Sequence, residues 1–359
     1  MTANPRQPED DTPVQDALEG VMTVAGPVHL HHGGSLSGVD LAWRLTGPAG
    51  APLVVVMGGI SGHRRVFGAV GEERGWWQEV AGPGGSFPID RVRVLAFDYL
   101  GGSGATTGPR PGDIPGSFPT VSSHDQASLL AHLLDHLDIA AVDAIVGASY
   151  GGMVALAFAA RFPQRAGRLL VVSAADRTDP MATAWRSMQR EVLRFALDCG
   201  RGADGLRLAR AMAMSTYRSR DEFAERFGGE ARRAAPDARF TFPVEEYLLA
   251  RGDDYARRYH PGGFLCLSES IDLHRVDATR VAVPVDAIAV TEDQLVPVAD
   301  VRAMVARLPQ GRLHVLSSHF GHDTFLKEGG LLRPFFEILT TASPTVASPT
   351  VASPTGSSA

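Results

Sequence analysis

A serine between glycines is the first sign of chemistry in this chain. Residues 147–151 read Gly-Ala-Ser-Tyr-Gly, after an apolar run over 144–146 and before a helix-forming stretch that begins near Met153. A tight turn between a strand and a helix has no room for β-carbons, which explains the flanking glycines. A strand, a serine-bearing turn and a helix together are typical of a nucleophile elbow, which exposes the serine oxygen at the end of a sheet. We therefore predict that Ser149 is a nucleophile for acyl chemistry.

A serine hydroxyl is a poor nucleophile until a base takes its proton, and the base needs a carboxylate to orient it. After a nucleophile elbow, the acid and then the base follow along the chain, on loops after later strands. An apolar run ends at Val290, and the loop after it offers two neighbouring carboxylates, Glu292 and Asp293. Either residue is a candidate for the acid.

Two of the three histidines near the next apolar run are candidates for the base. His314 lies within the run, where a structural role is expected, whereas His319 and His322 follow it. We favour His322 because Gly321 frees the backbone beside it and because a helix is expected to start directly after it. His319 is the alternative.

The negative oxygen that forms when a serine attacks a carbonyl needs two hydrogen-bond donors. The backbone N–H of Tyr150 directly follows the nucleophile and is the first candidate. Residues 57–62 read Met-Gly-Gly-Ile-Ser-Gly at the end of an apolar run, where paired glycines let a loop turn its amides inward. We therefore predict Ile60 as the second donor, with an ordinary glycine-rich turn as the alternative.

Hydrophobic patterns indicate the elements that must position these residues. Apolar, β-branched runs predict buried strands at 53–57, 92–97, 144–146, 169–172, 285–290 and 313–316. Helical spacing predicts helices at 125–137, 153–161 and 298–308. Alternating strands and helices with continuously apolar strands indicate an α/β fold with a mostly parallel, doubly wound sheet.

The alternation stops between residues 174 and 280, which are rich in Arg, Ala, Met and Leu at helical spacing. Because this block lies between strands of one sheet, we interpret it as an inserted helical lid rather than an independent domain. The core is then expected in two parts, 21–173 and 281–340. Residues 1–20 and 341–359 are expected to be disordered, the latter because prolines recur in its Ala-Ser-Pro-Thr repeat.

Composition excludes several classes of function. The net charge of −6 gives no basic footprint for nucleic acid, and no apolar run reaches the roughly 18 residues that span a bilayer. The polar N-terminus shows no signal peptide, so we expect a cytoplasmic protein. Two cysteines are too few for a disulfide framework or a thiolate metal site. His132 and His136 have helical ligand spacing, but Leu133 stands where a zinc protease motif needs glutamate, so we expect neither a metal nor a cofactor.

Several blocks of the chain, in order, resemble one family, the homoserine O-acyltransferases of the α/β-hydrolase fold. The blocks are the Trp76-Trp77 pair with 82–90, the glycine-rich stretch 97–109, the Phe-Pro segment 118–121, and 147–153, 213–219, 293–297 and 321–326. The resemblance implies an α/β-hydrolase fold with Ser149 as nucleophile, Asp293 as acid and His322 as base. This assignment agrees with the one made from the residues alone.

The resemblance also implies the substrates. It points to methionine biosynthesis, with acyl-CoA as the co-substrate and the side-chain hydroxyl of homoserine as the acceptor. Arg218 matches the arginine that holds the α-carboxylate of the amino acid, and Asp323 matches the carboxylate that meets its α-ammonium. A helix N-cap is the alternative role for Asp323. A homodimer packed through the lid helices is implied as well.

The acyl donor differs between members of this family. A succinyl donor carries a second carboxylate, which is costly to bury without a cation or hydrogen-bond donors. Arg64 and Arg65 beside the oxyanion loop, or Arg186 and Arg190 in the lid, could supply that charge, although they could equally bind CoA phosphates or be solvated. We favour succinyl over acetyl. Serine as the acceptor, and ester hydrolysis by the same three residues, are the remaining alternatives.

Overall fold

The computed structural model describes residues 17–68, 72–113, 117–233 and 235–341. Its main sheet has eight strands, in the spatial order β1 (Ala17–Thr23), β4 (Asp40–Thr46), β6 (Arg93–Phe97), β5 (Leu53–Met57), β7 (Ala144–Ala148), β8 (Leu169–Val172), β9 (Val285–Val290) and β10 (Gly311–Leu316). The pairs β1–β4 and β4–β6 are antiparallel, and the remaining neighbours are parallel. A short hairpin of β2 (Val28–His29) and β3 (Ser35–Leu36) stands apart.

Helices cover both faces of this sheet, which is why its central strands are apolar throughout. Along β5, Val55 packs into the core on one face, while Val54 and Val56 pack into the core on the other. The first face is covered by α2 (Ser123–His136), α3 (Tyr150–Arg161) and α9 (Val298–Val305). The second is covered by α1 (Gln78–Ala81), α10 (Thr324–Lys327) and α11 (Gly329–Phe336). The predicted α/β, mostly parallel sheet is therefore confirmed.

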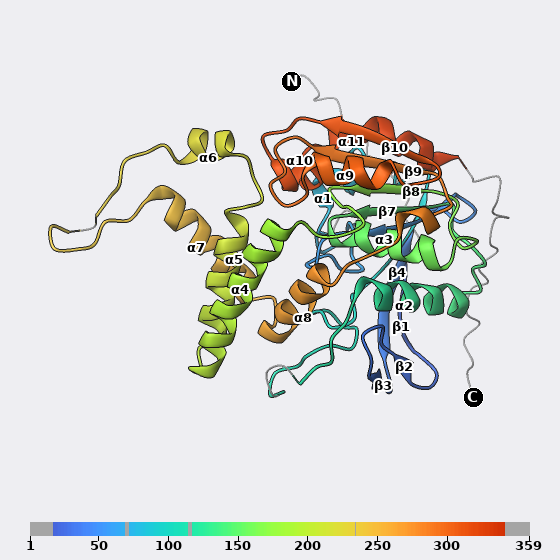
Figure 1. The fold of residues 1–359 in the computed structure, drawn as a ribbon, viewed down its shortest axis with the longest axis horizontal. Helices are drawn as coiled ribbons and strands as arrows, with labels where there is room; N and C mark the ends of the chain where they lie inside the picture. The colour runs from blue at the N-terminus through green and yellow to red at the C-terminus, as the bar shows by residue number, and fades with distance from the viewer. Residues whose placement is uncertain (1–16, 69–71, 114–116, 234, 342–359) are drawn as a thin grey trace, which may run out of the picture.

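Among the described residues, five α-helices stand between β8 and β9, where the sequence predicted a helical block. They are α4 (Pro180–Asp198), α5 (Gly202–Met214), α6 (Arg220–Phe227), α7 (Pro243–Ala256) and α8 (Pro261–Asp272). We call residues 174–280 the helical insertion. In Figure 1, α4 to α7 project to one side of the core, at the left of the view, and α8 lies next to the core. Three short 3₁₀ helices, η1 (Ala278–Arg280), η2 (Gly321–Asp323) and η3 (Glu337–Thr340), complete the described elements.

The N-terminal part of the fold differs from the expectation. Residues 17–20 were expected to be disordered but belong to β1, which pairs along its whole length with β4. The reason is that β1 lies at the edge of the sheet and is mostly exposed, so its sequence lacks the continuous apolar run of a central strand. Thr341, also expected to be disordered, is described, and its hydroxyl donates to the carbonyl of Ile338 at 3.0 Å. The rest of the expected disordered segments, 1–16 and 342–359, lies outside the described residues.

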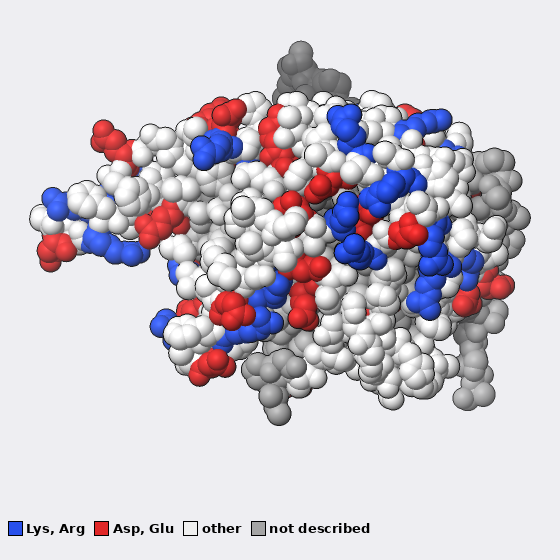
Figure 2. Space-filling model, viewed as in Figure 1, with Lys and Arg blue, Asp and Glu red and all other residues white. Residues whose placement is uncertain are grey.

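The described residues contain no helix long and apolar enough to cross a bilayer. On the face shown in Figure 2, acidic and basic side chains lie interspersed over both the core and the insertion.

Candidate active site

Ser149 lies in the turn between β7 and α3, at the carboxyl end of the parallel strands. Its φ of 53° is in the left-handed region, which is unfavourable for a residue with a side chain. The turn is also crowded, because a β-carbon on Gly147 would collide with the backbone of Gly151, and one on Gly151 with Met57. The two glycines are therefore required for the serine to be presented at this point.

The structure brings the predicted acid, base and nucleophile together in one chain of hydrogen bonds. Nε2 of His322 lies 2.9 Å from Oγ of Ser149, and Nδ1 of His322 lies 2.7 Å from Oδ2 of Asp293. The other carboxylate oxygen of Asp293 accepts the backbone N–H groups of Leu295 and Val296, at 2.9 and 3.0 Å. These amides fix the carboxylate, the carboxylate orients the imidazole, and the imidazole reaches the serine.

His322 is held by backbone contacts with the helical insertion. It lies in η2, where Gly321 has a φ of 50° and a β-carbon would press against two carbonyl oxygens, those of Glu292 and Tyr217. The N–H of His322 donates to the carbonyl of Tyr217 at 2.7 Å. The insertion thus contributes directly to the placement of the histidine.

The alternative residues lie elsewhere. Glu292 accepts hydrogen bonds from Oγ of Ser317 and the N–H of Ser318, at 2.6 and 2.8 Å. His319 is exposed to solvent. His314 bonds through Nε2 to Asp286 on the neighbouring strand, at 2.8 Å, as expected of a structural residue. The structure brings none of the three to Ser149.

Burial and charge act in opposite directions on the imidazole of His322. Burial by itself would lower its pKa, but the charge and hydrogen bond of Asp293 raise it, and Asp323 adds to this effect. Arg186 acts in the lowering direction, and the resulting pKa lies above the ordinary value of 6.5. The site therefore stabilises the protonated imidazole, which a base forms when it takes the proton of a serine.

Of the two predicted oxyanion donors, Tyr150 directly follows Ser149 and Ile60 belongs to a neighbouring loop. The loop that contains Ile60 lies against the nucleophile, since a β-carbon on Gly59 would lie 4.0 Å from Oγ of Ser149. Among the described residues, neither Ile60 nor Tyr150 donates its backbone N–H to another group. The lack of another partner is what an oxyanion role for these two amides requires, and that role stays a prediction.

The phenol of Tyr150 is not part of the cavity. Tyr150 is fully buried, and its hydroxyl hydrogen-bonds with Oγ of Ser270 on α8 at 2.6 Å. The residue after the nucleophile is therefore tied to the helical insertion.

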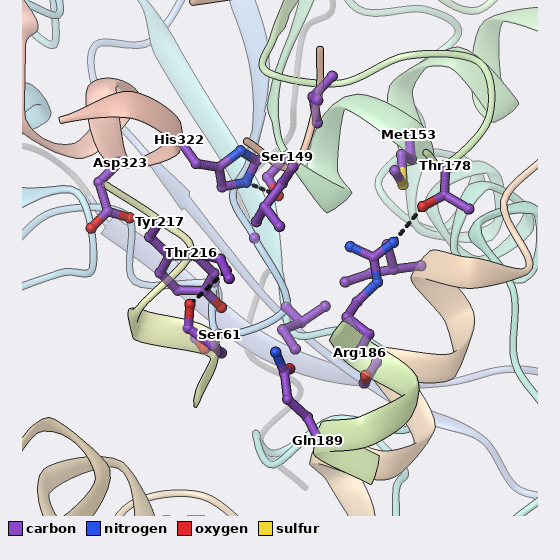
Figure 3. Close-up of a pocket in the computed structure, with 18 of the residues that line it drawn as sticks. Ser61, Ser149, Met153, Thr178, Arg186, Gln189, Thr216, Tyr217, His322 and Asp323 are labelled. Carbon is purple, nitrogen blue, oxygen red and sulfur yellow. Dashed lines mark hydrogen bonds between the residues drawn. The ribbon is translucent and has the colours of Figure 1, made fainter. Parts of the chain in front are cut away.

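A cavity between the core and the insertion opens over these residues (Figure 3). Ser149 and His322 line it, together with Ile60 and Asp323. The insertion contributes polar residues that the sequence did not single out as contacts, namely Thr178, Gln189, Arg210 and Thr216. No periodicity or motif marks these positions, because each reaches the cavity through the packing of its helix or loop.

Arg218 and Asp323 lie together as an ion pair. Nε of Arg218 lies 3.3 Å from Asp323, and its Nη1 donates to Glu222 at 2.6 Å. Asp323 lines the cavity, whereas Arg218 does not. Burial raises the pKa of Asp323, although Arg218, His322 and Arg210 act in the lowering direction. Arg210 does line the cavity, where its Nη1 donates to the hydroxyl of Tyr217 at 3.2 Å.

The described residues contain no group of three or more His, Cys, Asp or Glu side chains arranged to hold a metal ion.

A family model described as the alpha/beta hydrolase fold matches residues 52–329, so by fold the chain is an α/β hydrolase. A homoserine O-succinyltransferase of Xanthomonas campestris pv. campestris is 41% identical over 347 residues, which cover 96% of this chain and 89% of that relative. A homoserine O-acetyltransferase of Leifsonia xyli subsp. xyli is 33% identical, over 87% of this chain and 88% of that relative. The chain therefore belongs to the homoserine O-acyltransferase family, as predicted.

Two solved structures show how widely this fold is used. The homoserine O-acetyltransferase of Bacillus anthracis has a TM-score of 0.80 at 17% identity, covering 92% of this chain and 99% of that one. Esterase E22 has a TM-score of 0.79 at 18% identity, covering 91% of this chain and 100% of that one. The fold is therefore common to acyl transfer and ester hydrolysis, and the residues of the site must decide between them.

Proposed function

We propose that this protein is a homoserine O-succinyltransferase. It transfers the succinyl group of succinyl-CoA to the side-chain hydroxyl of homoserine through an ester on Ser149, as a step of methionine biosynthesis. The hydrogen-bonded chain of Ser149, His322 and Asp293, in a cavity that also contains the carboxylate of Asp323, is the observation that carries this proposal. The identity to the succinyl-transferring relative supports the choice of donor.

In the first half of the reaction, Oγ of Ser149 attacks the thioester carbon while Nε2 of His322 takes the hydroxyl proton. Asp293 stabilises the imidazolium that forms, and the amides of Ile60 and Tyr150 receive the negative oxygen. The C–S bond then breaks, His322 returns the proton to the sulfur, and CoA leaves as a thiol. No metal or cofactor takes part in this step.

In the second half, His322 takes the proton of the homoserine hydroxyl, and that oxygen attacks the ester carbon on Ser149. The bond to Oγ of Ser149 breaks, and His322 returns the proton to it. Asp323 binds the α-ammonium of homoserine. The α-carboxylate is assigned to Arg218, which is next to the cavity through its ion pair with Asp323, and to Arg210, which lines the same end of the cavity. The helical insertion covers the cavity and so excludes water from the ester.

A hydrolase uses the same three residues on water, so the products decide between the two activities. The purified chain is incubated with succinyl-CoA or acetyl-CoA, with and without homoserine or serine, and the products are identified by mass spectrometry. We expect O-succinylhomoserine as the main product. Release of free succinate at the same rate with and without homoserine would identify an esterase instead, and a preference for acetyl-CoA or for serine would replace the proposed donor or acceptor.

The pKa of His322 predicts how the rate depends on pH. Only the neutral imidazole accepts a proton, so kcat/KM for succinyl-CoA rises as the pH rises through the pKa of His322. Because Asp293 overcomes the effect of burial and raises that pKa, the midpoint of the rise is expected above pH 6.5. The measurement is kcat/KM between about pH 5 and 8, the range in which histidine titrates. A midpoint below 6.5 contradicts this prediction.

We also propose a homodimer in the cytoplasm. Apolar side chains on α4 and α5 that stay exposed in the single chain support association through the helical insertion, namely Met181, Met188, Phe195, Leu208 and Met212.

A further inference from the structure

Two helices of the insertion meet at the carboxylate of Asp272, at the end of α8. Three residues of α4, spaced so that they share one face of the helix, point toward it. Asp272 accepts hydrogen bonds from Oγ1 of Thr183 at 3.0 Å, Nε of Arg186 at 2.7 Å and Nη1 of Arg190 at 2.6 Å. Two guanidinium groups therefore share a single carboxylate.

This cluster has an excess of one positive charge in a place with little access to water. The side chains of Arg186, Arg190 and Asp272 are 11%, 9% and 9% exposed. A buried cation that lacks its own counter-charge is costly, because burial removes the water that would solvate it. An anionic ligand that reached this cluster would supply the missing charge.

The two arginines differ in where their remaining donors point. Arg190 also donates to the carbonyl and Oγ of Ser268, both at 3.1 Å, and to Oγ of Ser187 at 3.2 Å, and it does not line the cavity. Arg186 lines the cavity, and its Nη2 donates to Oγ1 of Thr178. Nη1 of Arg186 has no partner among the described residues. The excess charge therefore faces the cavity through Arg186.

A second donor lies beside it. Gln189 is only 4% exposed and lines the cavity, yet its side-chain amide has no hydrogen-bond partner among the described residues. Figure 3 shows Arg186 and Gln189 on one side of the cavity, and Asp323 with Tyr217 on the other, away from them. The cavity thus has two polar ends, and the end with Asp323 suits the ammonium group of the acceptor.

The other arginines near the site are less suited to hold an acyl carboxylate. Arg64 is bonded to Glu19 and Asp98, both at 2.6 Å, and does not line the cavity. Arg177 and Arg258 line the cavity but are exposed, so water already solvates their charge.

Arg65 and Arg210 are excluded for different reasons. Arg65 shares Glu19 at 3.3 Å and lies outside the cavity, whereas Arg210 stacks on Tyr217, at the end that holds Asp323. Arg186 is thus the remaining cation at the end of the cavity away from Asp323, where the acyl donor would bind.

We propose that Arg186 and Gln189 bind the terminal carboxylate of a dicarboxylic acyl donor and so select succinyl-CoA over acetyl-CoA. This inference rests on the proposed acyl transfer to homoserine and adds the residues that choose the donor. Nη1 of Arg186 and the side-chain N–H of Gln189 donate to the carboxylate. Its negative charge neutralises the excess positive charge of the cluster around Asp272. Arg190 stays paired with Asp272 and keeps α4 in place.

The test compares charged and neutral donors of equal chain length. Butyryl-CoA has the four acyl carbons of succinyl-CoA but a methyl group in place of the carboxylate. We expect Arg186→Leu to lower kcat/KM for succinyl-CoA by about 100-fold, the usual loss when a charged group loses its partner. Turnover of butyryl-CoA and acetyl-CoA should change only a few-fold. Gln189→Leu should lower kcat/KM for succinyl-CoA by about 10-fold.

The matched control is Arg194→Leu, which removes an arginine from the exposed side of the same helix, where it bonds only to Glu191. This variant should leave kcat/KM unchanged for succinyl-CoA, butyryl-CoA and acetyl-CoA. An equal loss for succinyl-CoA and butyryl-CoA in Arg186→Leu would mean that Arg186 is structural, and the inference would be wrong. A native protein that prefers acetyl-CoA would overturn the inference while leaving homoserine acylation intact. A native protein that acylates no homoserine would overturn the proposed function itself.

Discussion

Replacing Ser149 by alanine is expected to lower kcat for acyl transfer by at least about 10⁴-fold, because losing the nucleophile of such a triad leaves only the contribution of binding and of the oxyanion donors. The fold should not change, since the hydroxyl makes one hydrogen bond, to His322. The rate is measured as release of the CoA thiol in the presence of homoserine.

A second measurement tests the covalent intermediate directly. After incubation with succinyl-CoA and no acceptor, the intact mass of the native chain should increase by one succinyl group, and that of Ser149→Ala should not. Ser215→Ala is the control, because Ser215 is an exposed serine of the insertion that bonds only to the carbonyl of Met212. Turnover of Ser149→Ala near the native rate would rule out the ester mechanism.

The substitution Asp293→Asn has the next largest expected effect, a loss of about 10⁴-fold in kcat, as for the same change in serine proteases. An asparagine can donate its amide N–H to Nδ1 of His322, which leaves the proton on Nε2, where the base must be free. The packing around residue 293 should persist, because the side-chain oxygen can still accept the N–H groups of Leu295 and Val296.

The neighbouring carboxylate provides the control. Glu292→Gln removes a charge that serves Ser317 and Ser318 on the next loop, and it should change kcat within about threefold, as surface substitutions usually do. If Glu292→Gln caused the larger loss, Glu292 would be the acid, and the geometry seen here would not be that of the working enzyme.

The central part of this fold could be predicted because its signals are local. Strands such as Leu53–Met57 and Leu169–Val172 are buried on both faces, so they appear in the sequence as unbroken apolar runs. Parallel strands bring their carboxyl ends to the same edge of the sheet. Ser149, Asp293 and His322 follow three such strands, and the order of the strands is enough to expect them near one another.

The edge of the sheet and the cavity gave no comparable signal. β1 is recognised only when its partner β4 is in place, since most of its residues face solvent. The sequence placed Arg186 and Arg190 equally as candidates for an acyl carboxylate. What separates them is Ser268, 78 residues from Arg190 along the chain, because it takes up a donor of Arg190, while Arg186 keeps a donor for the cavity.

Arg218 is a second residue whose contacts could not be predicted from the sequence, here at the end of the cavity that would bind the amino acid. The family resemblance implied contacts with the amino acid for Arg218 and Asp323 separately. In the structure the two bind each other, and only Asp323 lines the cavity. Pairing between side chains 105 positions apart depends on how the insertion docks on the core, which no local pattern encodes.

The carboxyl-terminal half of helix α8 is joined to the rest of the molecule by several hydrogen bonds. Ser270 bonds to the residue that follows the nucleophile, and Asp272 bonds to α4. Swinging α8 outward would break these buried contacts, each of which costs about 1–3 kcal/mol to leave unmade. We therefore expect α8 to stay in place during turnover. We expect any movement that admits substrate or releases product to occur in the parts of the insertion farther from the sheet. The turn that carries Ser149 and Tyr150 then keeps its geometry from one turnover to the next.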